Sequence, residues 1–229
     1  MKKFKLTSEF IVDISGVKLF RIKALIEFGN VKAGDLGGYI EKEENLSHMG
    51  DAWVSDDARI SGNAQVFGNA QVFGDAQVFG DAWVFGNARV FGNAWVFGYA
   101  RVSGNARVSG NARVFGNAWV SGNARVFGDT QVFGDARVFG NAWVSGNARV
   151  FGDAQVSGDK DYAYAHGFGS CNRTTTFFRL KDGDVGVRCG CFYGTLAQFR
   201  DKVCETHGET KKAQEYLMLA DLMEIRFKN

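Results

Sequence analysis

The middle of the chain repeats one pattern of hydrophobic and polar positions every six residues. From Asp51 to Gly158, eighteen hexads follow one another without an insertion. Each reads Asn or Asp, Ala, a variable residue, Val, Phe or Ser, and Gly. A period this short is typical of a solenoid, in which each repeat buries its apolar side chains only against its neighbours. The pattern therefore predicts one continuous stacked core.

Each hexad predicts a four-residue strand, Ala-x-Val-x, followed by a corner. Side chains alternate between the two faces of a strand, so Ala and Val share one face and the variable residue and Phe or Ser share the other. Gly followed by Asn or Asp favours the left-handed backbone conformations of a tight turn. Three strands and three corners close an eighteen-residue coil. Six coils enclose seventeen Val and one Ile, and we expect an all-β parallel solenoid.

The Asn-Ala-x-Val spacing resembles that of the hexapeptide-repeat family of left-handed β-helix proteins. The resemblance implies a left-handed β-helix with three hexads per coil, whereas the periodicity alone also allows a right-handed β-helix of the bacterial-cytoskeleton type. The family often has Gly or a small or acidic residue after the aliphatic position, where this chain has Phe or Ser.

Asp56, Tyr99 and Thr130 depart from the repeat. Either a functional site at these positions or neutral sequence drift would explain the three departures.

The chain divides into residues 1–50, an N-terminal β cap, residues 51–164, the hexapeptide-repeat β-helix, and residues 165–229, a C-terminal α/β module with a hairpin and two helices. Ile40 and Leu46 are six residues apart, which suggests an irregular opening coil. Short strands are predicted in the cap at Phe4–Leu6, Phe10–Asp13 and Val17–Ala24.

In the last segment, Thr175–Leu180 and Val185–Cys191 read as a hairpin around a Lys-Asp-Gly-Asp turn. Thr195 can cap a helix that runs to about Thr206, and Thr210 can open a second helix to about Arg226. The stretches 26–31 and 34–41 resemble the N-terminal region of hexapeptide-repeat proteins encoded in phages and prophages. The stretches 190–195 and 205–208 resemble a small C-terminal module common in prophage proteins. This resemblance implies a phage or prophage origin and transfers no activity.

Residues eighteen apart stack on the same outward face, which predicts an unbroken column of five rings. The members of this Phe column are Phe79, Phe97, Phe115, Phe133 and Phe151. Monomers seldom leave an apolar stripe of this size open, so we expect a homo-oligomer, dimer or trimer, that uses the column as its interface. Alternatively, the rings stack on one another and on Arg stems and stay exposed in a monomer.

Arg89, Arg107 and Arg125 form a second outward column, one coil apart. Stacked like charges repel, so we expect neutralisation by corner residues such as Asp129 and Asp135. Alternatively, an anionic ligand binds along the column.

The charge and hydropathy of the chain do not favour a nucleic-acid-binding, membrane-spanning or secreted protein. The net charge of +2 is spread evenly, which does not favour nucleic-acid binding. No apolar run approaches the roughly 18 residues of a membrane span, and the N-terminus lacks a signal-peptide core. All four cysteines lie in the last third of the chain, and we expect reduced thiols and a location in the bacterial cytoplasm.

Candidate chemistry is sparse. Hexapeptide-repeat acyltransferases resemble this core and use a catalytic His between subunits, yet His48, His166 and His207 all lie outside the coils. His166, just after the last coil, is the best remaining base. A zinc site could draw on Cys189, Cys191, Cys204 and His207, although small buried side chains beside a helix explain them equally. No cofactor is expected.

We therefore expect a non-enzymatic structural or interaction protein that oligomerises through the Phe column. Its partner would be a phage or host protein or a small nucleotide, and an anti-defence role is one form of this hypothesis. The alternative is an acyltransferase that uses a coenzyme A thioester.

Overall fold

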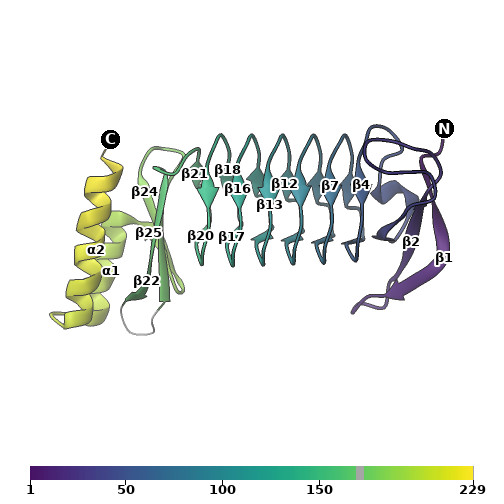
Figure 1. Cartoon of the computed structure of the whole chain (residues 1–229). Helices are drawn as coiled ribbons and strands as arrows, with labels where there is room; N and C mark the ends of the chain where they lie inside the picture. Colours follow the sequence, from purple (N-terminus) through teal and green to yellow (C-terminus); the bar gives the residue numbers. More distant parts are fainter. Residues whose placement is uncertain (169–172, 229) are drawn as a thin grey trace.

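A computed structural model describes residues 1–168 and 173–228 and shows a rod with different structures at its two ends (Figure 1). Stacked coils form the middle, a hairpin of β1 (Phe4–Val12) and β2 (Lys18–Ala24) lies at one end, and two helices lie at the other. The chain is a parallel β-solenoid with a small C-terminal α/β module, as predicted. β1 is one continuous strand where two short strands were expected.

Every hexad contributes one strand, made of its variable residue and the following Val or Ile. The strands are β4 (Trp53–Val54), β5 (Arg59–Ile60), β6 (Gln65–Val66), β7 (Gln71–Val72), β8 (Gln77–Val78), β9 (Trp83–Val84), β10 (Arg89–Val90), β11 (Trp95–Val96), β12 (Arg101–Val102), β13 (Arg107–Val108), β14 (Arg113–Val114), β15 (Trp119–Val120), β16 (Arg125–Val126), β17 (Gln131–Val132), β18 (Arg137–Val138), β19 (Trp143–Val144), β20 (Arg149–Val150) and β21 (Gln155–Val156). They are shorter than the predicted four residues because the backbone already turns into a corner on either side.

The strands form three sheets along the rod, and each strand pairs in parallel with the strand three further along the chain. Val90 pairs with Val108, for example, so equivalent residues stack eighteen apart. The sheet through β5 and β20 also contains β3 (Leu36–Ile40), where Ile40 pairs with Ile60. Leu46 forms a parallel bridge to Val66. The opening coil predicted from Ile40 and Leu46 is thus confirmed.

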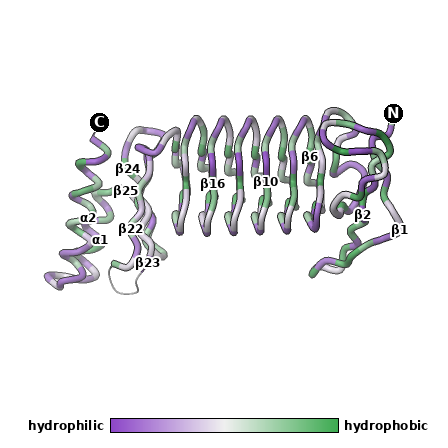
Figure 2. The backbone as a smooth tube through the Cα atoms, viewed as in Figure 1, coloured by the Kyte–Doolittle hydropathy of each residue, from purple (hydrophilic) through white to green (hydrophobic). Residues whose placement is uncertain are grey.

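The interior of the coils is dry and uniform. The Ala and Val positions of the hexads are 0–1% exposed, and hydrophobic and hydrophilic positions alternate within every coil (Figure 2). Thr130, which replaces one Ala, is also buried, and its hydroxyl donates to the carbonyl oxygen of Phe127 at 2.7 Å. The hydroxyl is satisfied within its own corner, so this departure from the repeat has a structural explanation.

The corners need glycine for two reasons. Gly110 has a φ of +68°, which L side chains rarely adopt, and a Cβ there would lie 2.9 Å from the backbone nitrogen of Gly128 in the next coil. Asp56 adopts the same conformation with a φ of 56°, and its carboxylate accepts a hydrogen bond from the Gly74 amide at 2.9 Å. The local hydrogen bond explains why Asp is tolerated at this one corner.

Side-chain amides run along one edge of the rod as a ladder. Each Asn Nδ2 donates to the Oδ1 of the Asn one coil further on, at 3.1–3.2 Å. The ladder consists of Asn69, Asn87, Asn105, Asn123 and Asn141. On the other two edges the acceptor is an Asp at several positions, as where Asn111 donates to Asp129 at 2.9 Å. The repeated Asx position therefore ties coil to coil at the surface.

Two polar side chains of the N-terminal cap donate hydrogen bonds to carbonyl oxygens of the first coil. Elsewhere in the rod, the preceding coil provides these donors. Lys3 Nζ donates to the carbonyl oxygens of Gly50 (3.1 Å) and Ala52 (2.7 Å). Asn45 Nδ2 donates to those of Gly62 (3.1 Å) and Ala64 (2.9 Å). Carbonyls at these hexad positions accept from backbone amides of the preceding coil elsewhere in the rod. The cap thus satisfies acceptors that would otherwise be buried without a donor.

Lys3 makes the stability of this cap depend on pH. Its side chain is buried, and desolvation lowers the pKa of the amine to about 8, against a weaker opposing effect of Asp51. Between pH 8 and the unfolded pKa near 10.4, the unfolded state therefore binds more protons, and stability must rise with pH. We expect the free energy of unfolding to increase by on the order of 2 kcal/mol from pH 8 to 10. Urea titrations of the wild type and of Lys3→Met would measure this, and equal slopes against pH in the two proteins would contradict it.

The C-terminal module is an antiparallel sheet covered by two helices. Its strands are β22 (Tyr162–Phe168), β23 (Arg173–Arg179), β24 (Val185–Cys189) and β25 (Phe192–Thr195). The helices are α1 (Leu196–His207) and α2 (Lys211–Phe227). Thr195 and Thr210 accept backbone hydrogen bonds as N-caps, and Gly208 follows α1, so the predicted helices are confirmed. β22 begins at Tyr162, which moves the start of the module slightly before residue 165.

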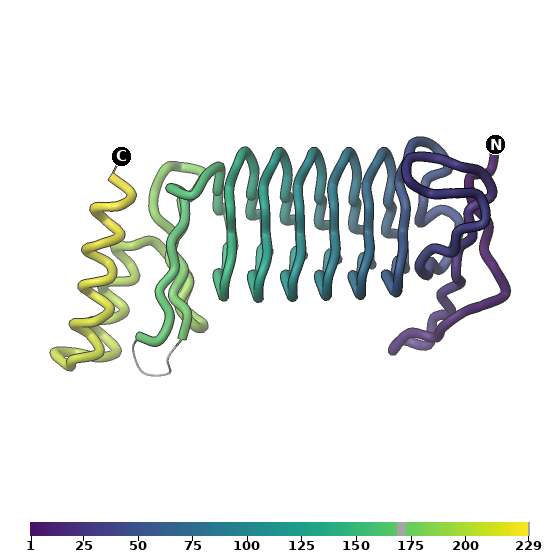
Figure 3. The backbone as a smooth tube through the Cα atoms, in the orientation of Figure 1, coloured from purple at the N-terminus to yellow at the C-terminus, as the bar shows by residue number. Residues whose placement is uncertain are grey.

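The module closes the end of the solenoid instead of hanging from it by a linker (Figure 3). Phe178 of β23 is fully buried and belongs to the core of the coils. Ala154 forms a bridge with Leu180, and the Arg149 amide donates to Thr176 Oγ1 at 2.9 Å. The hydroxyls of Tyr164 and Tyr193 lie where a next coil would contact the last glycine corners. The module therefore serves as the second cap.

Candidate functional site

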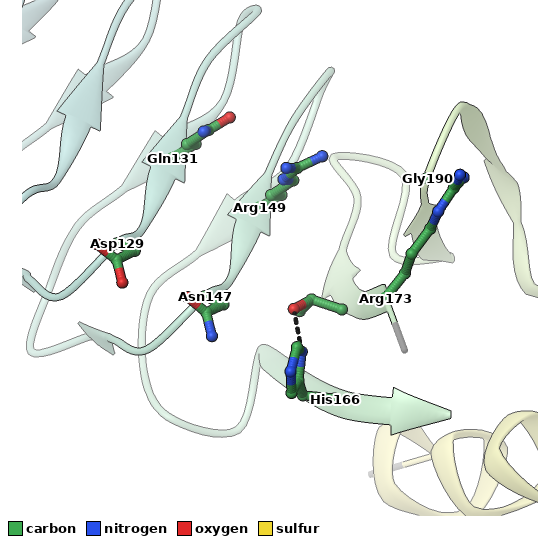
Figure 4. A pocket seen from close by; sticks show the side chains of 8 residues that line it. Asp129, Gln131, Asn147, Arg149, His166, Arg173 and Gly190 are labelled. Carbon is green, nitrogen blue, oxygen red and sulfur yellow. Dashed lines mark hydrogen bonds between the residues drawn. The ribbon is translucent and has the colours of Figure 1, made fainter. Parts of the chain in front are cut away.

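A cavity of about 570 Å³ lies where the last coils meet the module (Figure 4). We call it the junction cavity. It is lined by Asp129, Gln131, Asn147, Arg149, His166, Arg173, Thr174 and Gly190. Gln131 and Arg149 are outward residues of β17 and β20, which belong to one sheet. The other walls come from the β22–β23 hairpin and the turn after β24.

Three of the eight residues that line the junction cavity, Arg149, His166 and Arg173, are basic. Within residues 1–168 and 173–228, no ion pair joins Arg149 or Arg173 to a carboxylate. Asp129, the one acidic side chain of the lining, accepts a hydrogen bond from Asn111. His166 Nδ1 and Thr174 Oγ1 are hydrogen-bonded at 3.0 Å (Figure 4). The structure thus places the candidate base His166 in a cavity with two guanidinium groups that have no ion-pair partner among the described residues.

A second cavity of about 260 Å³ lies inside the module, and we call it the module cavity. It is lined by Arg173, Cys189, Cys191, Phe192, Phe199, Lys202, Val203, Thr206, His207 and Tyr216. Three of the zinc candidates therefore face one cavity, whereas Cys204 does not line it. In the described part of the chain, no group of three or more His, Cys, Asp or Glu could hold a metal ion. Cys189 Sγ instead lies 3.2 Å from Thr175 Oγ1, which donates to it.

The Phe column is present as predicted, and its rings stack face to face. Phe79, Phe97, Phe115 and Phe133 are spaced 4.8–4.9 Å apart with interplanar angles of 3–7°. Phe151 follows at 4.5 Å with a tilt of 35°. All five rings are half-buried, less open than the exposed stripe that we expected. The spacing of neighbouring strands, about 4.8 Å, falls in the range of centroid distances for offset-stacked rings, so each ring covers part of its neighbours.

The module seals one end of the Phe column. The Tyr193 ring meets Phe151 edge-on at 4.8 Å, and the Arg188 guanidinium lies 5.4 Å from the centre of the Phe151 ring. Burial raises the pKa of Tyr193. The open part of the column is therefore the stretch along the coils.

The Arg column is also present, since Arg89, Arg107 and Arg125 pair in register. The expected ion pairs with corner aspartates are not formed among the described residues. Asp129 and Asp135 instead accept amide hydrogen bonds along the corners. The Arg89 guanidinium lies over the Phe73 ring and that of Arg125 over the Trp143 ring, at 5.1 and 4.7 Å. For these two members of the column, ring faces take the place of carboxylates.

A family model described as the YdcK beta solenoid repeat matches four overlapping stretches of the coils, residues 100–114, 106–122, 130–146 and 142–158. The chain is a β-solenoid repeat protein. No curated protein matches it in a sequence search. Within the described part of this β-solenoid, no helix is long and apolar enough to cross a lipid bilayer.

Sequence reasoning did not find Arg149, Arg173, Thr174 or Gly190 as parts of a site in this β-solenoid. Arg149 occupies an ordinary hexad position, and only the fold of the module over the last coil distinguishes it from the other coil arginines. The signal that could have pointed to it is its place in the last coil of its sheet, directly before the repeat ends.

Proposed function

We propose that this protein is a non-enzymatic interaction protein whose rod self-associates along the Phe column into a symmetric dimer or trimer. The column is straight and continuous over five coils of one flat face. Neighbouring rings cover the ring faces, so the ring edges remain for a partner. A second copy offers an identical column with the same spacing, which makes the contact self-complementary.

The observation that carries this proposal is the continuity of the column. The other two faces are interrupted by serines, and Phe139, which has no stacked neighbour among the described rings, is 36% exposed. An uninterrupted apolar stripe gives a rigid rod a long, specific contact, whereas isolated rings do not. The rod would then hold two or three C-terminal modules at fixed positions for a further partner.

Both chain ends resemble proteins encoded in phages and prophages, and this resemblance supports a role for the protein during phage infection or lysogeny. We propose that the protein acts in the cytoplasm of an infected or lysogenic bacterium, in assembly or as an anti-defence protein. Binding of a host or phage partner by the module is the step that would connect the rod to either role.

Replacing two rings of the column should weaken self-association. In Phe97→Ser/Phe115→Ser, the stacked pair is replaced by the residue that other hexads carry at the same position. We expect the dissociation constant of the oligomer to rise by at least about 100-fold, because every copy loses two apolar contacts. Sedimentation equilibrium over a range of protein concentrations would measure this constant.

Phe73→Ser/Phe91→Ser is the matched control, since these two rings also stack at 4.9 Å but lie on another face. The control should retain the oligomer of the wild type. Equal weakening by both double variants would assign the effect to lost stability and would contradict an interface at the Phe column.

The position of His166 in the junction cavity favours one second candidate, a coenzyme A-dependent acyltransferase. His166 would take the proton of an acceptor hydroxyl or amine as that group bonds to the thioester carbonyl, and the carbon–sulfur bond would break to release the thiol. Thiol release from acetyl-coenzyme A with a panel of acceptors tests this candidate. Absence of release above background by the wild-type protein would remove it.

A further inference from the structure

The junction cavity and the module cavity share one side chain, Arg173. The two cavities differ in character, because the first is lined by polar and basic groups and the second mainly by aromatic rings and thiols. Three consecutive residues also connect the two cavities. Cys189 and Cys191 line the module cavity, and Gly190 between them lines the junction cavity. A ligand in contact with Arg173 can therefore reach both environments.

The basic groups of the junction cavity are suited to an anion. Arg149, His166 and Arg173 come from different strands, β20, β22 and β23, and face one space. The guanidinium groups have no ion-pair partner in the described part of the chain. An arginine fork matches the oxygens of phosphate or carboxylate in a bidentate geometry, which neutral or cationic ligands cannot exploit.

The turn at Gly190 is shaped around Arg173. Gly190 has a φ of +59°, and a Cβ at this position would collide with Arg173 Nη1. Figure 4 shows the Arg173 side chain extending toward Gly190, away from His166. The Arg173 guanidinium therefore lies beside the backbone of Gly190, at the boundary between the two cavities.

The module cavity is suited to a planar ring. Phe192 and Phe199 lie 5.5 Å apart, and Phe199 meets Tyr216 edge-on at 5.7 Å. These rings pack on one another, and Tyr216 also stacks on His207 at 5.8 Å, so they give the cavity an aromatic wall against which a further ring can pack. Lys202 adds a positive charge to the lining. The volume of about 260 Å³ is smaller than that of the junction cavity, which leaves room for one ring system and not for a large ligand.

We propose that the two cavities form one binding site for a small organic phosphate that carries an aromatic ring, of which a nucleoside monophosphate is the simplest class. The phosphate binds in the junction cavity, where Arg173 holds it at the boundary and Arg149 and His166 add positive charge or hydrogen-bond donors to the lining, and the ring enters the module cavity. Phosphate is favoured over carboxylate because it carries more anionic oxygens for a lining with several basic side chains. The site lies at the module end of the sheet that carries the Phe column, since Gln131 and Arg149 stand two residues before Phe133 and Phe151.

Calorimetric titration with adenosine 5′-monophosphate, adenosine and inorganic phosphate tests the two-part site. We expect the monophosphate to bind at least about 10-fold more tightly than either fragment. Arg173→Gln should weaken its binding by about 10- to 100-fold, the effect of removing a charged hydrogen-bond donor. Arg101→Gln is the matched control, since Arg101 is also an exposed arginine of the coils, lies outside the Arg column and lines neither cavity.

Alkylation of the thiols gives a second readout that does not require a variant. Cys191 lines the module cavity, whereas Cys204 is exposed and lines neither cavity. Saturating adenosine 5′-monophosphate should slow the reaction of Cys191 with iodoacetamide and leave that of Cys204 unchanged, as read by peptide mass spectrometry. Absence of binding, equal affinity for phosphate and the monophosphate, or unaltered binding by Arg173→Gln would each overturn the proposal.

Discussion

Phe178→Ala is expected to lower the free energy of unfolding by about 3–5 kcal/mol, the usual cost of removing a buried aromatic side chain from a core. Phe178 belongs to the module by sequence but is fully buried in the core of the coils. Its loss would leave a void at the contact between the last coil and the sheet of the module. We therefore expect the module to unfold separately from the coils in this variant, whereas the wild type unfolds in one transition.

Urea denaturation followed by circular dichroism, together with hydrogen exchange of the coils and the module, would measure both effects. Phe168→Ala is the matched control, because Phe168 lies in the same sheet with 39% of its surface exposed and should change stability little. A loss below about 1 kcal/mol for Phe178→Ala, or unchanged coupling of the two parts, would show that the module does not share the core of the solenoid.

Gly110→Ala is expected to destabilise the protein by about 2–4 kcal/mol. The left-handed backbone conformation alone costs an alanine roughly 1–2 kcal/mol. The added Cβ would also lie 2.9 Å from the backbone nitrogen of Gly128. Gly128 is backbone whose carbonyl accepts from the Asn111 amide, and the amides of Phe127 and Asp129 on either side of it donate to the next coil, so it cannot move away as a flexible side chain could.

Gly158→Ala provides the comparison for this corner. Gly158 ends the last hexad and has no positive φ, and a Cβ added there would meet no atom within 4 Å beyond its chain neighbours. We expect the free energy of unfolding of this variant to stay within about 0.5 kcal/mol of the wild type. Thermal melts of the two variants would measure the difference, and equal effects would mean that close stacking of the corners does not limit the residue at Gly110.

The coils could be predicted from the sequence because the spacing of apolar residues, the turn residues and the unbroken period all indicate the same structure. The spacing of Ala and Val sets the buried face, the Gly-Asx pairs set the corners, and the absence of insertions sets the register. The same register placed Phe79 to Phe151 in one column and Arg89 to Arg125 in another. Handedness rests only on the resemblance to hexapeptide-repeat proteins and stays a prediction.

Outside the repeat, local signals were sufficient for the helices and insufficient for the sheet. Thr195 and Thr210 are followed by apolar periodicity, so both helix starts were found. β22 and β25 were missed because their stability comes from pairing with β23 and β24, which short apolar segments do not reveal. The junction cavity depends on how β23 docks on the last coil, and no local pattern encodes that contact.

The neutralisation of the coil arginines shows a further limit of pattern reasoning. Corner aspartates follow the arginines closely in sequence, which suggested ion pairs. In the structure, Asn111 and Asn117 donate hydrogen bonds to the carboxylates of Asp129 and Asp135. An arginine such as Arg113 instead lies over the Trp95 ring. Two competing partners, an amide and a ring face, were each stacked one coil away and were therefore invisible to a count of charges.

Native mass spectrometry of the full-length wild-type protein tests the central proposal most directly. We expect a dimer or trimer that persists at low micromolar concentration and that Phe97→Ser/Phe115→Ser converts to monomer. A wild-type protein that is monomeric under these conditions would contradict self-association along the Phe column.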